Sequence, residues 1–251
     1  NLNKNFKKII LFSNQNFANI ISYFITINFR KSLKIIAFER NHINELHYYF
    51  GIGDLIKKSI IKLMMKILYR KFNVIACNSK EASKDLTKFL NLKVLNIYNP
   101  ISLDVKRPKK INSNKKNFQI LNIGRLEKQK DQVTLIKAIN ELSNKINVKL
   151  NIVGYGSEFY NLKKYISKLN LNNNVKIFTK IQNPWIYFKK IDLFILSSIY
   201  EGFPNVLVEA ILQNIPVISS NCKSGPKEIF GSKGGPNLFD VGDHKDLPKK
   251  I

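Results

Sequence analysis

Short apolar stretches alternate with stretches of helical periodicity along almost the whole chain, and no other feature constrains the fold as strongly. This alternation is typical of an α/β fold with parallel sheets. In the first part of the chain it predicts strands over residues 7–12, 33–38, 73–77 and 93–98. Between them it predicts helices over residues 16–30, 54–72 and 80–90.

A polar, charged segment at residues 104–117 interrupts the alternation, and we interpret it as a linker. After it, strands are predicted over residues 118–123, 148–153, 175–178, 191–198 and 215–220. Helices are predicted near residues 131–144, 157–170, 185–190, 204–213 and 226–230. The chain thus predicts two Rossmann-like domains, an incomplete one at residues 1–103 and a fuller one at residues 118–251. We expect the ligand in the cleft that they face, beyond the carboxyl ends of the strands.

The formal net charge of +25 invites a nucleic-acid interpretation. The lysines are spread along the whole chain together with many Asn and Ile residues, however, as a general bias of an AT-rich genome would also produce. No RNA-binding aromatic motif, zinc-finger spacing or basic zipper is present. Nucleic acid is therefore not the expected partner. The net charge by itself does not distinguish a polyanion-binding protein from one with a biased composition.

Cys77 and Cys222 do not form a disulfide framework or a metal set, so we expect a reducing compartment. No apolar run approaches 18 residues, and the polar residues after position 12 interrupt the first run too early for a signal peptide. Because the chain begins with Asn and ends in what looks like the start of a helix, we expect a fragment of a longer protein.

A basic loop follows the first strand of the second domain. Gly124 permits a tight turn, and Arg125 and Lys130 are both free to face outward from the strand end. A guanidinium fork together with an ammonium group suits a diphosphate. The alternative is a solvated turn in a lysine-rich protein.

The next strand ends at Gly154, in a shortened glycine turn that brings backbone close to a ligand or to another strand. The third glycine of the dinucleotide fingerprint is missing, which weakens a Rossmann cofactor interpretation.

Two glutamates, Glu201 and Glu209, flank the start of a predicted helix after the fourth strand. Gly202 allows a flexible approach, Pro204 suits the first helical position, and the N–H groups near Phe203, Asn205 and Val206 face beyond the sheet. A carboxylate that accepts two hydrogen bonds fits a vicinal diol such as ribose. The alternative is that Glu201 complements the helix dipole and Glu209 is merely an exposed helix position.

A fourth strand exit carries another Gly-Pro turn, at residues 221–228. Glycine-bearing loops thus recur at four of the five predicted strand exits of this domain, which we expect to share one edge. One shared ligand site explains this recurrence better than four unrelated turns.

In this order and spacing, GRLEKQKDQVTLIKA, NIVGYGSE, NPWIYFKKIDLFILSSIYEGFPNVLVEA and CKSGPKEI resemble the C-terminal domain of a family-4 retaining glycosyltransferase of the GT-B fold. The two glutamates match that family's E-x7-E motif. Upstream, IAFERNHINEL, IACNSKEASKDL and IYNPIS are similar to the later part of its N-terminal domain. The family's opening strand and its C-terminal crossing helix have no counterpart, so the resemblance implies truncation at both ends.

The resemblance implies roles for individual residues. Arg125 and Lys130 would hold the donor diphosphate, Glu209 the ribose, and Glu201 with the backbone after it the donor sugar; Gly154 would line the nucleoside pocket. The catalytic set implied is Glu201, Arg125 and Lys130. The donor-binding set is Gly124, Arg125, Lys130, Gly154, Glu201, Gly202, Phe203, Asn205, Val206 and Glu209. Thr179 stands where the family usually has glycine, which puts the local loop geometry in question.

The chemistry of the residues agrees with that resemblance. Breaking the bond between an anomeric carbon and a diphosphate leaves negative charge on the phosphate, which Arg125, Lys130 and a helix N-terminus would stabilise. No Asp-x-Asp occurs in the chain, so we expect neither a metal nor a cofactor to be required. Retention at the anomeric centre is implied by the resemblance alone.

In the first domain, Arg40 and Asn41 match a pair that members of this subtype often place on the acceptor side. His42 beside them is either a ligand contact or a partly exposed loop histidine. The segment 54–72 predicts a basic amphipathic helix with lysines at four-residue spacing. We expect its apolar band, Ile60, Leu63, Met64, Ile67 and Leu68, to pack on the sheet; docking on an anionic membrane surface is the alternative.

The expected function is transfer of a sugar from a nucleotide donor, with uridine the commonest base in such families, to a glycan or lipid-linked acceptor in polysaccharide or oligosaccharide assembly. The expected place is the cytoplasm, with peripheral contact to the inner face of the membrane. Three alternatives stay open: a sugar-nucleotide epimerase of the same architecture, a non-catalytic polyanion-binding protein, and a chain that binds donor without turnover.

Overall fold

The computed structural model describes residues 9–29, 33–101, 117–231 and 235–251, and in it the chain forms two compact α/β units. The first unit consists of Asn1–Asn99 together with two later segments, Tyr200–Phe203 and Lys223–Glu228. The second consists of Pro100–Ile199, Pro204–Cys222 and Ile229–Ile251. Of the linker expected at residues 104–117, all but Asn117 lies outside the described residues.

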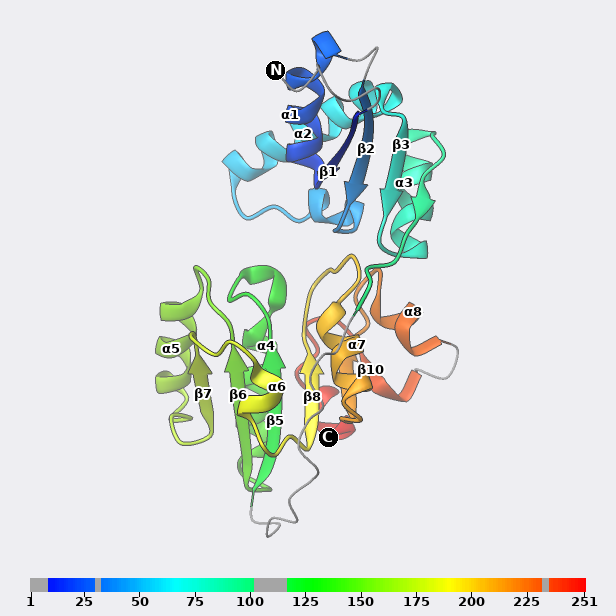
Figure 1. Ribbon diagram of the computed structural model, residues 1–251. Coiled ribbons are helices and arrows are strands. Elements are labelled where there is room, and N and C mark those ends of the chain that lie inside the picture. Colours follow the sequence, from blue (N-terminus) through cyan, green and yellow to red (C-terminus); the bar gives the residue numbers. More distant parts are fainter. Residues whose placement is uncertain (1–8, 30–32, 102–116, 232–234) are drawn as a thin grey trace. The chain divides into compact units, whose positions relative to one another are not determined.

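The first unit has a parallel sheet in the order β1-β2-β3-β4 (Figure 1). Its strands are β1 (Ile9–Asn14), β2 (Leu33–Glu39), β3 (Val74–Cys77) and β4 (Leu95–Asn96). Its helices are α1 (Asn16–Ile25), α2 (Ile52–Leu68) and α3 (Lys80–Leu90), with short 3-10 turns at Ile27–Phe29, Ile43–His47 and Tyr69–Lys71.

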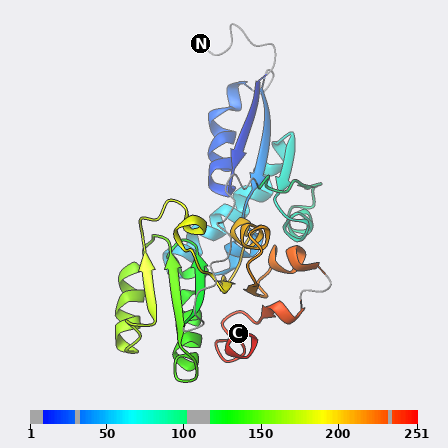
Figure 2. The ribbon, with the colours of Figure 1, turned by 60° about the horizontal axis from the view of Figure 1, so that its bottom comes forward.

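The second unit has a six-stranded parallel sheet in the order β10-β9-β8-β5-β6-β7 (Figures 1 and 2). Its strands are β5 (Phe118–Ile123), β6 (Val148–Val153), β7 (Val175–Phe178), β8 (Leu193–Leu196), β9 (Val217–Ser220) and β10 (Leu238–Phe239). Its helices are α4 (Gln132–Leu142), α5 (Phe159–Lys168), α6 (Pro184–Tyr187), α7 (Asn205–Leu212) and α9 (Leu247–Lys250). The short helix α8 (Pro226–Phe230) spans the boundary between the two units.

This strand order is that of a doubly wound fold, in which the direction of winding reverses between β5 and β8. Both faces of the sheet are covered. Along β8, Phe194 packs into one buried cluster and Ile195 into another on the opposite face. The α/β prediction with two parallel sheets is confirmed. In such a sheet, ligands bind beyond the carboxyl ends of the strands at the point of reversal.

Several predicted boundaries were wrong by a few residues. The helix expected at 16–30 ends as α1 at Ile25, and the strand expected at 93–98 contains only the two residues of β4. Pro204 lies at the N-cap of α7 with an extended backbone instead of at the first helical position. The strand β10 was not predicted, whereas α9 lies where the end of the sequence looks like the start of a helix.

The expected apolar band of α2 was only partly right: Leu68 is buried and Met64 packs against the core of the first unit, as expected. Ile60, Leu63 and Ile67 are each more than half exposed, and the buried residues of the helix are Ile61, Met65 and Leu68. Apolar side chains surround almost the whole helix. Periodicity therefore does not reveal which stripe packs inward.

Candidate functional site

The loop after β5 carries Arg125 and Lys130 and is fixed from both sides. Inside the loop, Leu126 is fully buried, and its N–H donates to the Tyr155 carbonyl at 2.8 Å. Toward β8, the Ser197 hydroxyl donates to the Lys130 carbonyl at 2.8 Å. These hydrogen bonds hold the loop rigidly at the point where the winding of the sheet reverses. We call this loop, residues 124–130, the basic ledge.

Arg125 and Lys130 are held on the basic ledge by different contacts. Arg125 is exposed, and its Nη2 donates to Gln129 Oε1 at 3.1 Å, which orients the guanidinium. The aliphatic stem of Lys130 lies over Gly124, where an added Cβ would meet it at 3.5 Å. Such a pair presents a fork and a point charge together, which suits the oxygens of a diphosphate.

Gly154 has a packing role. A Cβ added to Gly154 would lie 1.8 Å from the carbonyl oxygen of Gly124. A Cβ added to Gly156 would lie 2.3 Å from the carbonyl oxygen of Leu126. The loop after β6 therefore lies directly against the basic ledge. Thr179, the departure noted in the sequence, is not among the described residues with a positive φ, so its backbone is unstrained there.

Helix α7 begins beside the same edge and has no side-chain N-cap in its first turn, which contains Asn205 and Val206. Its positive end is therefore not neutralised by a capping side chain. Glu209 follows within the helix and is partly exposed. Its Oε2 accepts a hydrogen bond from the Trp185 indole Nε1 at 3.0 Å.

The segment Glu201–Phe203 belongs to the first unit. Glu201 is 6% exposed, and Gly202 forms an antiparallel bridge with Asn41. A Cβ on Gly202 would stand 1.7 Å from the Arg40 carbonyl oxygen, so only glycine fits there. The structure thus brings Arg40 and Asn41, predicted for the acceptor side, against Gly202, predicted for the donor side.

The same segment is held by further contacts inside this unit. The Phe203 ring packs on Tyr98 with centroids 5.3 Å apart, and the Tyr98 hydroxyl hydrogen-bonds to Glu228. Glu228 also accepts from the backbone N–H of Lys80 at the start of α3, at 3.0 and 3.1 Å.

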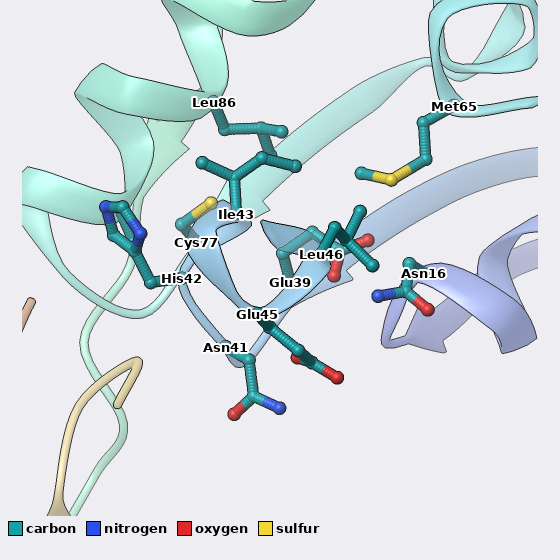
Figure 3. Close-up of a pocket in the computed structure, with 11 residues that line it drawn as sticks. Asn16, Glu39, Asn41, His42, Ile43, Glu45, Leu46, Met65, Cys77 and Leu86 are labelled. Carbon is teal, nitrogen blue, oxygen red and sulfur yellow. The ribbon is translucent and has the colours of Figure 1, made fainter. Parts of the chain in front are cut away.

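His42 is 1% exposed and fully engaged within the first unit. Its Nδ1 accepts from the Asn44 N–H at 3.1 Å, which leaves Nε2 as the protonated nitrogen that donates to Asp85 at 3.0 Å. Burial lowers the pKa of His42, against the opposing effect of Asp85, so the ring is neutral near pH 7. Figure 3 shows the ring turned toward α3. This geometry is that of a structural histidine.

A small cavity in the first unit is lined by Asn16, Glu39, Asn41, His42, Glu45 and several apolar side chains (Figure 3). It offers about 10 Å³ to the centre of a water-sized molecule, roughly the space of one water. A sugar ring does not fit.

Glu39 in this cavity wall was not singled out from the sequence. It is buried at the end of β2, and its Oε1 accepts from Asn19 Nδ2 at 2.9 Å and from the Tyr69 hydroxyl. Burial raises the pKa of Glu39 to about 7, more than these hydrogen bonds lower it. The sequence did contain a signal for this residue, because Glu39 is an acidic residue at the end of the apolar strand β2.

Among the described residues, no group of three or more His, Cys, Asp or Glu side chains is arranged to hold a metal ion. None of the helices in this part of the chain is both long and apolar enough to cross a membrane.

Residues 105–251 match the family model described as "Glycosyl transferases group 1". An uncharacterized glycosyltransferase of Methanocaldococcus jannaschii is 35% identical over 75% of this chain and 48% of its own length. The N-acetylgalactosamine-N,N'-diacetylbacillosaminyl-diphospho-undecaprenol 4-alpha-N-acetylgalactosaminyltransferase of Campylobacter jejuni is 34% identical over 74% of this chain and 52% of its own length. The chain thus spans about half the length of these curated relatives.

Among solved structures, a mutant of S. aureus TarM in complex with Fondaparinux, alpha-GlcNAc-glycerol and UDP superimposes with a TM-score of 0.73 and 21% identity. The likeness covers 91% of this chain and 45% of that one. It shows that the fold is GT-B.

Proposed function

Because this chain belongs to the glycosyl transferases group 1 family, we propose that it moves a sugar from a UDP-sugar donor to a glycan or lipid-linked acceptor in polysaccharide or oligosaccharide assembly. One observation carries the donor half of this proposal. Arg125 and Lys130 lie on a rigid loop at the reversal point of a doubly wound sheet, where such folds bind their ligands.

The roles follow from the chemistry of each group. Arg125 and Lys130 bind the diphosphate and stabilise the charge that it gains as the anomeric bond breaks. The uncapped start of α7 adds the positive end of a helix dipole. Glu209 accepts the ribose hydroxyls, and Glu201 with Gly202 and Phe203 contacts the donor sugar.

Uridine is proposed as the base because TarM, which shares the fold, was crystallised with UDP. A lipid-linked acceptor is proposed because the C. jejuni relative is named for a diphospho-undecaprenol substrate. Arg40 and Asn41 are proposed on the acceptor side. His42 is left out, since both of its ring nitrogens are already engaged.

We further propose family-4 chemistry that retains the anomeric configuration and needs no metal. Two cations on one loop supply the charge that a metal would otherwise bring to the leaving diphosphate. Measuring donor affinity in EDTA tests the metal independence, and the anomeric configuration of the product tests retention.

Contact with an anionic membrane surface is proposed through α2. Ile56, Ile60, Leu63 and Ile67 form one stripe along the helix, and each is more than half exposed. Exposed cations, including Lys57 and Arg70, flank that stripe. An apolar stripe with basic flanks is the pattern of a helix lying in a membrane interface.

The deciding experiment is calorimetric titration of the folded chain with UDP and UDP-sugars in EDTA, beside Glu209→Ala. Micromolar binding that the variant loses supports the donor site. Binding to polyanions that falls steeply with salt and is unchanged in Glu209→Ala would instead support the polyanion-binding alternative. An epimerase would convert the donor sugar without any acceptor.

A further inference from the structure

Trp185 is the single tryptophan of the chain, and it is buried beside the proposed nucleotide site. It lies on the short helix α6, is 6% exposed, and packs on Phe194 with ring centroids 5.7 Å apart. This packing fixes the indole ring within the core of the second unit. The ring's one polar atom, Nε1, donates to Glu209 Oε2 at 3.0 Å.

The hydrogen bond fixes the glutamate as well. A glutamate side chain on a helix surface is free to rotate, but here one oxygen is tied to a rigid indole. Within the part of the chain that the structure describes, no hydrogen bond is made to the other oxygen, Oε1. A carboxylate has about four acceptor sites, so the indole occupies one and leaves both oxygens able to accept a further hydrogen bond.

Resting on the proposed function, we infer that Trp185 is a positioning residue that presents Glu209 to both vicinal hydroxyls of the ribose in a ribonucleoside diphosphate. The indole N–H thereby determines how strongly the site discriminates ribose from 2′-deoxyribose. A fixed carboxylate gains two charge-assisted hydrogen bonds from a ribose, whereas a rotating one loses part of that gain in ordering. A deoxyribose supplies only one hydroxyl and leaves an acceptor unpaired.

The test compares the dissociation constants of UDP and 2′-deoxy-UDP, measured by calorimetry with the whole chain. The wild type should prefer UDP by about 10-fold or more. In Trp185→Phe, which keeps an aromatic ring but has no donor, the preference should fall to about 3-fold or less, with the affinity for 2′-deoxy-UDP nearly unchanged. Tyr187→Phe is the matched control, because it removes a hydroxyl from the same helix and should leave the preference intact.

A second variant covers the case in which Trp185→Phe does not fold. Replacement of Trp185 by β-(3-benzothienyl)alanine keeps the size and shape of the ring but replaces the N–H with sulfur. It should show the same loss of preference at wild-type thermal stability. Fluorescence gives an independent signal, since binding of UDP should change the Trp185 emission more than binding of 2′-deoxy-UDP does.

The outcomes distinguish a failure of the proposed function from a failure of the inference about Trp185. If folded wild type does not bind UDP at all, the proposed function fails, and this inference fails with it. If the wild type binds UDP and 2′-deoxy-UDP equally, or if the benzothienyl variant keeps the wild-type preference, the inference is overturned and the donor site stands.

Discussion

The carbonyl oxygen of Gly124 occupies the space that a side chain on Gly154 would need, 1.8 Å from the position of the added Cβ. Gly154→Ala must therefore push apart the loops after β5 and β6. We expect a loss of about 1–3 kcal/mol in the free energy of unfolding, together with weaker UDP binding, because the basic ledge would move. Urea unfolding followed by circular dichroism measures the first effect.

Gly124→Ala is the matched control for this pair. An added Cβ at Gly124 meets only side-chain carbons of Lys130 at 3.5 Å and beyond, which is ordinary contact. It should cost less than 1 kcal/mol. Equal losses in the two variants would show that the close approach at Gly154 is not the cause.

Glu39 should make stability depend on pH. Burial raises its pKa from the ordinary 4.5 to about 7, so the folded state holds its proton more tightly than the unfolded state. The stabilisation is complete below pH 4.5 and is lost as pH rises to 7, with a total on the order of 3 kcal/mol. Glu39→Gln does not titrate and should gain stability relative to the wild type over this interval.

Chemical unfolding at pH 4.5, 6 and 7.5 distinguishes the outcomes. The difference between Glu39→Gln and the wild type should grow from one pH to the next and level off above pH 7. A constant difference would mean that Glu39 titrates alike in the folded and unfolded states.

Arg125→Ala should weaken UDP binding by about 10- to 100-fold and leave uridine binding unchanged, because in the proposed site the guanidinium binds the diphosphate and not the nucleoside. Lys128→Ala removes the same charge from the same loop and should change UDP affinity by less than about 3-fold. Calorimetry with both ligands measures this contrast. Equal losses in the two variants would indicate a general effect of positive charge.

The sequence predicted most of the strands, because strands buried on both faces are continuous apolar runs, as at β8. Prediction failed where the packing partners of a helix decide which of its apolar faces is buried. Nothing local marks Ile61 instead of Ile60 as the inward side of α2, since both are apolar.

Contacts across long separations were likewise beyond the sequence pattern. Asn19 and Tyr69 reach Glu39 from 20 and 30 residues away, and Trp185 reaches Glu209 from 24 residues away. The residue types of the basic ledge could be read from the sequence. The backbone contact that makes Gly154 necessary depends on how two neighbouring loops pack.

The exposed stripe of α2 predicts binding to anionic lipid. Vesicles containing phosphatidylserine or phosphatidylglycerol should co-sediment with the chain, and binding should fall at high salt because the flanking cations contribute. Leu63→Glu places on the stripe a negative charge, the same sign as that of the lipid head groups. It should reduce the partition coefficient onto the vesicles by at least about 5-fold. Ile146→Glu makes the same change at an exposed apolar residue of the second unit and should have little effect. Equal reductions in both variants, or equal binding to neutral vesicles, would show that net charge or general stickiness, and not α2, governs the association.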